Sequence, residues 1–370
     1  MKIFSRLMAG TMLVLSLAGV AAFGQHYTQT NLISNESGVA PVTDPDLINP
    51  WGISRGSGTP WWVSDNGTGL STLYSGAGVK EGLVVTIPPA VTGSTGSPTG
   101  TIYNGSATSF LITGGKPAAF LFSTLDGTIV GWNSTAGAVT AVTTMDGTVY
   151  TGLTSASIGN NLYLYAANFS LGRVDVYNSS FAPVNLGWDR FNDYSLPWGY
   201  VPFNVQAIGD NIVVTYALHE RGQKLESDGP GWGFVDVYSS AGVLLLRLQR
   251  GEWLNAPWGV ALAPDDFGRF SHDLLIGEFA GGGTTKYSGT IAAYNLFTGR
   301  LDGLLEDSTG APLAINGLWA ISPGNQGNNY NANGAPAAQL FFTAGPNGGS
   351  GGLFGFLSPV STEMIQGNDQ

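Results

Sequence analysis

The chain of 370 residues contains no cysteine, which excludes disulfide bonds, thiolate nucleophiles and thiolate metal ligands. Charged residues are scarce, at 11 %, and the formal net charge is −11. An acidic chain of this kind argues against nucleic acid or an anionic lipid surface as a partner. Beyond residue 24 no segment has the 18 or so consecutive apolar residues of a membrane-spanning helix, so we expect no membrane span.

The N-terminus has the pattern of a secretion signal. Lys2 and Arg6 precede an apolar run, and Ala22-Phe23-Gly24 offers small residues at the positions required for cleavage. We therefore expect residues 1–24 to be a signal peptide and the mature protein to be exported, to the periplasm or outside the cell. Without disulfides, packing and chain closure must stabilise the exported fold.

Glycine and aromatic residues are plentiful, and the chain repeats a short sequence motif, which we call a word. "NPWGIS" at 49–54 returns as "APWGVA" at 256–261, in each case just before a short apolar run. Weaker copies recur roughly every 50 residues, which is a period typical of propeller blades. They are "PTGTI" (98–102), "GLTSASI" (152–158), "PFNVQAI" (202–208) and "GLWAIS" (317–322).

Two further words follow each copy, and together they indicate four strands per repeat. One is an apolar run such as "IVVTYA" (212–217). The other is a strand that follows a glycine and ends in an aromatic residue, such as "GFVDVY" (233–238), with a hairpin turn after it. No run has sustained helical periodicity. The sequence thus predicts an all-β fold: a single six-bladed β-propeller of four-stranded blades over 25–359, followed by a tail at 360–370.

The last repeat contains only three strand-like runs before the chain ends. The mature N-terminus, "HYTQTNLIS" (26–34), alternates like the outer strands of the other repeats. We expect it to supply the fourth strand and close the ring, because closure removes an exposed sheet edge. Pro-Trp-Gly should mark the start of an innermost strand, with glycine allowing close packing at the axis and the indole lying between blades.

Several of these words resemble a family of exported bacterial β-propellers of the NHL-like type, some of which carry PEP-CTERM sorting tails. The resemblance rests on words such as "DPDLINPWGIS", "LYAANFSLGRVDVYN" and "LFFTAGPNGGSGGLFGFL", and it extends over about 30–357. It implies a six-bladed propeller and no established activity.

In such a ring the loops that precede the innermost strands share one face, here called the top. Acidic side chains outnumber basic ones on the loops assigned to this face, so an acidic channel mouth is expected. An acidic surface that only keeps the protein soluble is the alternative. The residues expected to contact a ligand at the mouth are Trp51, Asp65, Asn66, Asp126, Asn168, Phe203, Asn204, Asn255, Trp258, Asn316 and Trp319.

Only one histidine falls on a top loop, in the long insertion "ALHERGQKLESDGPGWG" (217–233). His219 and Glu220 are the candidate catalytic residues, because an imidazole and a carboxylate can exchange protons near neutral pH. An exposed pair without catalytic function is the alternative.

Carboxylate and amide side chains at the ends of the second strands suggest a cation site on the axis. Asp65, Asn168, Asn204 and Glu278 offer oxygen ligands without thiolates or imidazoles, which favours Ca²⁺ over zinc. No other cofactor is indicated. The alternative is that these residues cap strand ends and form turns.

These features lead to one main hypothesis and two rivals. The main hypothesis is an exported, monomeric scaffold that binds a small molecule, a glycan or a protein on its acidic top face. The first rival is a divalent-metal-dependent hydrolase or lyase, similar to six-bladed lactonases, with its site at the channel mouth. The second is a structural component of a cell-surface matrix.

Overall fold

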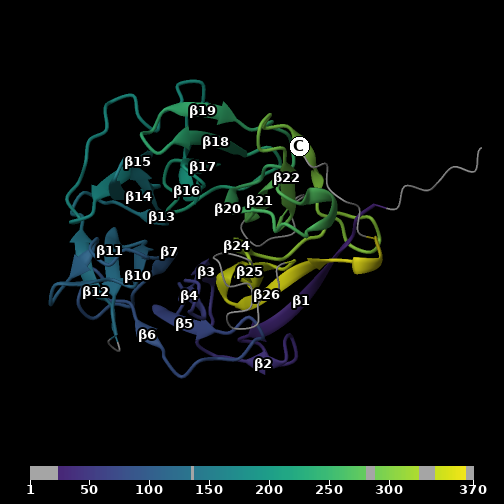
Figure 1. Cartoon of the computed structure of the whole chain (residues 1–370), viewed down its shortest axis with the longest axis horizontal. Helices are drawn as coiled ribbons and strands as arrows, with labels where there is room; N and C mark the ends of the chain where they lie inside the picture. Colours follow the sequence, from purple (N-terminus) through teal and green to yellow (C-terminus); the bar gives the residue numbers. More distant parts are fainter. Residues whose placement is uncertain (1–23, 135–136, 281–287, 325–337, 364–370) are drawn as a thin grey trace, which may run out of the picture.

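The computed structural model describes residues 24–134, 137–280, 288–324 and 338–363. In this part the chain forms six β-sheets arranged as a ring around a central axis (Figure 1). This confirms the six-bladed β-propeller. The predicted signal peptide, except for Gly24, and the last seven residues of the predicted tail lie outside the described residues.

The first three blades come from the first half of the chain. Blade one contains β3 (Pro50–Ser54), β4 (Trp61–Asp65), β5 (Leu70–Tyr74) and β6 (Val85–Thr86). Blade two contains β7 (Pro98–Tyr103), β10 (Phe120–Thr124), β11 (Thr128–Trp132) and β12 (Val139–Thr143), with a small ribbon of β8 (Leu111–Ile112) and β9 (Lys116–Pro117) beside it. Blade three contains β13 (Tyr150–Ile158), β14 (Asn161–Asn168) and β15 (Arg173–Asn178).

The other three blades complete the ring. Blade four contains β16 (Tyr200–Ile208), β17 (Asn211–Leu218), β18 (Gly233–Ser239) and β19 (Leu244–Arg247). Blade five contains β20 (Pro257–Leu262), η1 (Gly268–Phe270), β21 (Leu274–Glu278), β22 (Ile291–Tyr294) and β23 (Leu301–Leu304). Blade six contains β24 (Leu318–Pro323), β25 (Leu340–Ala344), α1 (Pro346–Gly349) and β26 (Leu353–Pro359), followed by η4 (Ser361–Glu363). None of the helices in the described ranges is long and apolar enough to cross a bilayer.

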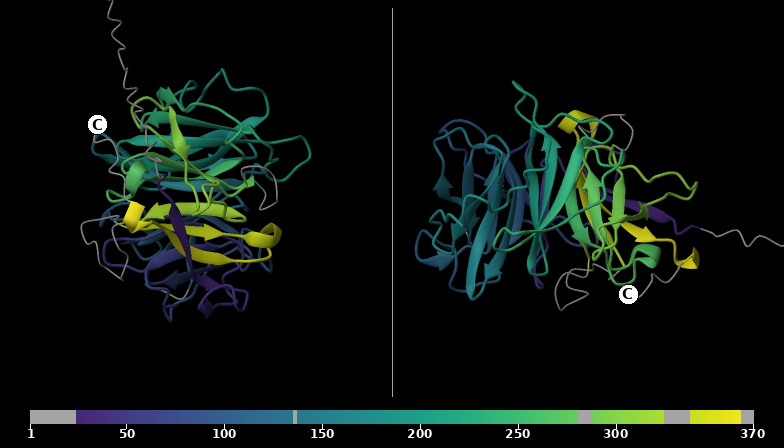
Figure 2. Two further views of the ribbon diagram at one scale, coloured as in Figure 1. Left: turned by 90° about the vertical axis from the view of Figure 1, so that its right-hand side faces the viewer. Right: turned by 90° about the horizontal axis from the view of Figure 1, so that it is seen from above.

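The N-terminal strand closes the ring as the sequence predicted. β1 (Tyr27–Ser34) pairs antiparallel with β26, from Tyr27 opposite Pro359 to Ser34 opposite Leu353. Figure 1 shows this purple strand beside the yellow C-terminal strands, and Figure 2 shows the ring from two sides. A short parallel strand, β2 (Val42–Thr43), continues the sheet outward. Blade six is therefore built from both ends of the described chain.

Blade three corrects one expectation, because it has three strands where four were predicted. After β15 the chain turns and makes only a brief contact with it, in which the Val184 N–H donates to the Val176 carbonyl at 2.8 Å. The following residues then leave the sheet. Residues 185–200, which we call the rim segment, pass over the outside of blade three and reach the start of β16.

Apolar side chains fill the spaces between neighbouring blades. One cluster, for example, joins blades three and four, and it includes Tyr165 of β14 and Tyr238 of β18. Close to the axis, glycines let the innermost strands approach one another. A Cβ atom on Gly52 would lie 2.6 Å from the Thr99 carbonyl oxygen, and one on Gly100 would lie 2.4 Å from the Leu153 nitrogen. The glycine of the repeated word is therefore required by packing at the axis.

Candidate functional site

The tryptophans of the repeated word meet at the top of the axis. Trp51 and Trp319 stack with their ring centroids 3.6 Å apart, and Phe279 stacks on the other face of Trp319 at the same distance. Trp258 and Phe203 contact this stack edge-on or tilted, at 5.6 Å and 6.0 Å from Trp319. All five side chains are buried. We call this cluster the aromatic plug.

The aromatic plug corrects the expectation that the indoles pack between blades. Trp51, Trp258 and Trp319 are the second residues of their innermost strands, and these indoles from blades one, five and six pack against one another. Hydrogen bonds hold two of them, since Trp319 Nε1 donates to Asn49 Oδ1 and Trp258 Nε1 donates to the Thr151 carbonyl. Trp51, Phe203, Trp258 and Trp319 were predicted to contact a ligand. The structure brings them together but buries them.

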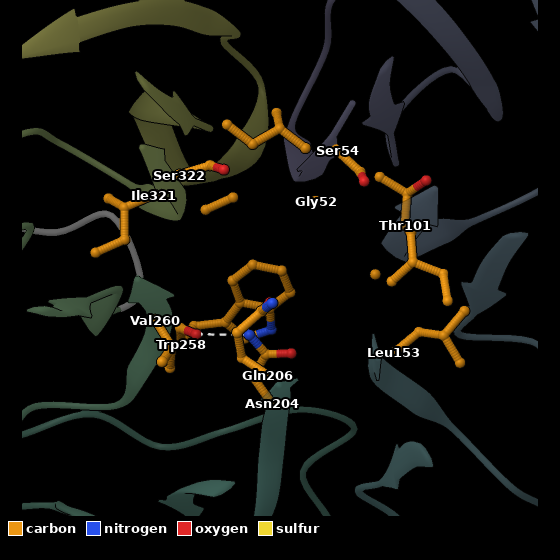
Figure 3. A pocket seen from close by; sticks show the side chains of 14 residues that line it. Gly52, Ser54, Thr101, Leu153, Asn204, Gln206, Trp258, Val260, Ile321 and Ser322 are labelled. Carbon is orange, nitrogen blue, oxygen red and sulfur yellow. Dashed lines mark hydrogen bonds between the residues drawn. The ribbon is translucent and has the colours of Figure 1, made fainter. Parts of the chain in front are cut away.

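Below the aromatic plug lies a small polar cavity of about 60 Å³ (Figure 3). Asn204 borders it and donates from Nδ2 to the Trp258 carbonyl at 2.7 Å. Ser54, Thr101 and Gln206 are among the other lining residues. Because one water molecule occupies about 30 Å³ of liquid, this cavity has room for a few waters and not for an organic substrate.

The two carboxylates predicted to bind a cation are buried in separate blades. Asp65 Oδ2 accepts a hydrogen bond from the Thr72 N–H in blade one, and Glu278 Oε2 accepts one from the Asn255 N–H in blade five. Within the described residues, Asp65 Oδ1 and Glu278 Oε1 have no hydrogen-bond partner. Burial raises the pKa of both groups well above the ordinary value, which favours the protonated, uncharged form of each acid.

The predicted amide ligands make hydrogen bonds to other segments of the chain. Asn168 donates to Thr148 Oγ1 and Asp175 Oδ2 in blade three, and Asn66 donates to the Pro98 carbonyl. Asn255 Oδ1 accepts from the Gly229 N–H, and Asn316 Oδ1 accepts from the Asn347 N–H. One carboxylate oxygen of Asp126 is buried without a partner in the described ranges.

Most of these hydrogen bonds join residues 20 or more positions apart, so they are contacts between segments and not the local turn contacts that were the alternative explanation for the predicted cation ligands. Across the described residues, no group of three or more His, Asp or Glu side chains is placed to hold a metal ion. Amide and backbone oxygens also bind Ca²⁺, so the cation site stays a prediction.

His219 and Glu220 are each held within their own loop. The His219 ring packs on Phe169 at 4.7 Å, and its Nε2 lies 3.0 Å from the Gln223 carbonyl. Glu220 Oε2 accepts from Ser227 Oγ at 2.7 Å. In the same loop, Leu225 packs against the apolar cluster that contains the aromatic plug. The geometry therefore gives these residues structural partners within the loop.

The acidity expected for the top face is partly neutralised. Asp44 is buried and forms an ion pair with Lys80 at 2.7 Å, and Asp46 pairs with the same ammonium group at 2.8 Å. Burial also raises the pKa of Asp65 and Glu278, which favours their uncharged forms. A count of acidic residues on top loops therefore overestimates the negative charge that a ligand would meet.

A different group of residues, on the rim segment, has the features of a binding surface. Trp188, Tyr194 and Trp198 are 84 %, 70 % and 89 % exposed, which is exceptional for such large aromatic side chains. We call these three residues the aromatic rim. The signal in the sequence was "NLGWDRFNDYSLPWGY" (185–200), where an outer strand was expected but Pro197 and two acidic residues, Asp189 and Asp193, interrupt the alternation.

The rim segment is fixed to the ring at two points. Phe191 is buried between blades three and four, 5.5 Å from the Tyr165 ring and 5.3 Å from the Tyr238 ring. Asp193 forms an ion pair with Arg247 of β19, and Arg247 Nη1 donates to Ser195 Oγ at 2.7 Å. The exposed aromatics thus project from an anchored backbone, which lowers the entropy lost on binding.

Two cavities adjoin the aromatic rim. One, of about 450 Å³, lies along β15 and is lined by Trp188, Asn185 and Arg190 among others. The other, of about 360 Å³, lies at the top of blades three and four and is lined by Trp198, Asn192 and His219 among others. Phe191 borders both. Their volumes are in the range of small-molecule sites, unlike that of the channel cavity.

Comparisons with known proteins identify relatives without a described function. The chain is 28 % identical over 337 residues to "Uncharacterized protein R648" of Acanthamoeba polyphaga mimivirus, covering 88 % of this chain and 78 % of the relative. It is 29 % identical over 306 residues to "Uncharacterized protein L690" of the same virus, covering 79 % and 77 %. These relatives are viral, whereas the resemblance noted in the sequence pointed to bacteria. No family model matches the chain.

Among solved structures, the PQQ-bound aldose sugar dehydrogenase of Streptomyces coelicolor aligns with a TM-score of 0.51 and 13 % identity, covering 90 % of this chain and 98 % of that one. The virginiamycin B lyase of Staphylococcus aureus aligns with a TM-score of 0.45 and 10 % identity, covering 91 % and 100 %. At such identities the likeness shows the fold alone. Propellers of this kind include both enzymes and scaffolds, so function must be argued from the site.

Proposed function

We propose that this protein is a non-catalytic, exported scaffold that binds its ligand on the outer rim of its top face, beside blades three and four. Two observations taken together support this most. Aromatic side chains fill the channel mouth, and other aromatic rings are exposed to solvent on an anchored segment. The aromatic plug occupies the axial position where six-bladed enzymes of the lactonase type would place a site. The aromatic rim instead presents rings to solvent beside two cavities.

The positions of the titratable groups favour binding over catalysis. A general acid and a general base must both reach the reacting atoms of one substrate. Asp65 and Glu278 are buried in blades one and five, and each is hydrogen-bonded within its own blade. His219 and Glu220 make their hydrogen bonds inside the 219–232 loop, and the His219 ring packs on Phe169. No described pair of these groups converges on one cavity large enough for a substrate.

The rival proposal is a divalent-metal-dependent hydrolase or lyase with its site at the channel mouth. It requires the loop carrying Leu225 to move and a cation to gather oxygens from several blades. It would make activity sensitive to a chelator and to Glu278, and insensitive to the aromatic rim.

A comparison of variants at the two places separates these proposals. Wild-type protein is screened against immobilised oligosaccharides and a random peptide library, with and without EDTA. The same screen is run on a rim variant, Trp188→Ala with Trp198→Ala, and on a channel variant, Glu278→Gln. We expect the wild type to bind a ligand and the rim variant to lose this binding. The channel variant should bind as the wild type does, and EDTA should have no effect. Binding, or hydrolysis of a lactone panel, that depends on Glu278 or on metal would overturn the scaffold proposal.

A further inference from the structure

The aromatic rim combines features that point to one class of ligand. We propose that Trp188, Tyr194 and Trp198 form a carbohydrate-binding site that takes a soluble, neutral oligosaccharide chain. This inference rests on the proposed binding function and names its ligand. It uses residues that lie apart from those expected at the channel mouth.

The exposed rings match the apolar faces of pyranose sugars. A pyranose ring presents C–H groups on its faces and hydroxyl groups around its edge. An indole or phenol face, which carries partial negative charge, therefore attracts the C–H face of a sugar. Trp188 and Trp198 are more than four-fifths exposed, so both of these indoles offer a large area for such contact.

Polar side chains that can bond sugar hydroxyls alternate with the rings. Asn185 and Arg190 line the cavity beside Trp188, and Asn192 lines the cavity beside Trp198. A guanidinium group can donate hydrogen bonds to two neighbouring hydroxyls at once. An amide group can donate a hydrogen bond to one hydroxyl and accept one from its neighbour. Each cavity thus pairs one aromatic ring with hydrogen-bonding groups, as a sugar subsite requires.

The same alternation argues against a protein partner. Protein interfaces bury a central set of aromatic anchors from which charged residues are depleted. Here Asp189 and Arg190 lie between Trp188 and the next exposed ring, and they contact each other at 3.4 Å. A partner protein would have to desolvate these charges to reach the rings, whereas a hydrated glycan would leave them in water.

The relative orientation of the rings indicates the kind of carbohydrate. The Trp188 and Tyr194 rings have centroids 6.3 Å apart and are tilted by 50°. Rings that bind a flat crystalline polysaccharide surface must be coplanar, so these two cannot both lie against one. A tilted pair can contact two faces of a flexible chain, which favours a soluble oligosaccharide.

The two cavities suggest that more than one sugar unit is bound. They lie on either side of Phe191, which borders both and is itself buried. An oligosaccharide that crosses the rim segment at Phe191 would place one unit against Trp188 and another against Trp198. Because Phe191 and Asp193 anchor the segment, both subsites exist before the ligand arrives.

The charge of the surroundings favours a neutral ligand. Asp189 and Arg190 pair with each other, and Arg173 pairs with Asp175 at 2.6 Å. The guanidinium groups next to the cavities are therefore matched by carboxylates. No excess of positive charge among the described lining residues would select a uronic acid or a sulfated sugar.

The test is an array of neutral and acidic oligosaccharides probed with the full-length mature protein, followed by calorimetric titration of the strongest hits. We expect neutral oligosaccharides to bind, and longer chains to bind more tightly than single sugars. Trp188→Ala and Trp198→Ala should each weaken binding by about tenfold, because each removes one stacking surface. Trp198→Phe, which keeps a ring, should recover part of the loss.

Phe297→Ala is the matched control. Phe297 is an exposed aromatic residue (76 %) in the turn between β22 and β23 of blade five, outside the rim segment. It should bind as the wild type does, and melting temperatures confirm that every variant is folded. Absence of binding to any oligosaccharide, or binding that the two tryptophan variants keep, would refute the carbohydrate site. Peptide binding that these variants lose would refute the ligand class while leaving the scaffold function in place.

Discussion

Trp319 of blade six stacks on Trp51 of blade one at 3.6 Å, so the last and first blades meet through their indoles at the axis. Phe279 of blade five covers the other face of Trp319 at 3.6 Å. One side chain thus joins three blades. The ring is held at its centre by these aromatic contacts and at its rim by the β1–β26 pairing.

Trp319→Ala should be strongly destabilising. It removes a large buried side chain with rings on both faces, and such truncations cost about 3–5 kcal/mol. Urea unfolding followed by circular dichroism measures the change. Trp198→Ala is the control, since an exposed side chain should shift the free energy of unfolding by no more than about 0.5 kcal/mol. Equal unfolding curves for the two variants would show that the stack contributes little.

Deletion of residues 25–34 should destabilise the whole ring. It removes β1 from its pairing with β26 and exposes a sheet edge. We expect a much lower melting temperature and aggregation on heating, measured by differential scanning fluorimetry and light scattering. The point variant Ile33→Ala, which truncates a fully buried residue, should cost about 2–4 kcal/mol, while Thr28→Ala on the exposed face should be neutral. A deletion variant that melts like the wild type would contradict closure by this strand.

Stability should fall as the pH rises from about 4.5 to about 7, because of Glu226. Burial and, to a smaller extent, the negative charge of Asp228 raise the pKa of this carboxyl to about 7. Its Oε2 atom has no hydrogen-bond partner among the described residues. A raised pKa in the folded state means that the folded protein holds the proton more tightly than the unfolded chain. Stability from this group is therefore present below about pH 4.5 and is lost between there and about pH 7.

Glu226→Gln should remove this dependence. The amide stays neutral at every pH, so the variant should gain stability at pH 8 and change little at pH 4. A shift from 4.5 to about 7 corresponds to at most about 3 kcal/mol, and opening of the loop alone would reduce it. Urea unfolding at several pH values between 4 and 8 measures the slope. Glu220→Gln, at an exposed carboxylate of the same loop, is the control. Parallel pH profiles for Glu226→Gln and the wild type would contradict the assignment.

Glu278→Gln should keep the fold, since burial raises the pKa of the acid and an uncharged amide of the same shape can accept the same Asn255 N–H. Calorimetric titration of chelator-treated protein with Ca²⁺ then tests the predicted cation site. If Asp65 and Glu278 only cap strand ends, neither protein shows binding heat or a shift in melting temperature at millimolar Ca²⁺. Binding by the wild type that Glu278→Gln abolishes would establish an axial ion.

The sequence by itself determined the ring. The repeated words set the number of blades, and the alternating residues 26–34 identified the closing strand, because alternation and turn chemistry are local properties of a strand. The glycines that follow Trp51 and Trp258 likewise predicted close packing at the axis. These features could be read without coordinates because each depends on neighbouring residues in the chain.

Only the tertiary structure decided where the key side chains point. Whether Trp51 lies between blades or at the axis depends on the direction of its side chain relative to five other blades, which no local pattern encodes. The raised pKa values of Asp65 and Glu278 follow from burial by distant residues and not from the type of residue. The aromatic rim also became visible only in three dimensions. A missing outer strand in blade three, together with the anchoring of Phe191 between Tyr165 and Tyr238, exposes Trp188 and Trp198 instead of burying them.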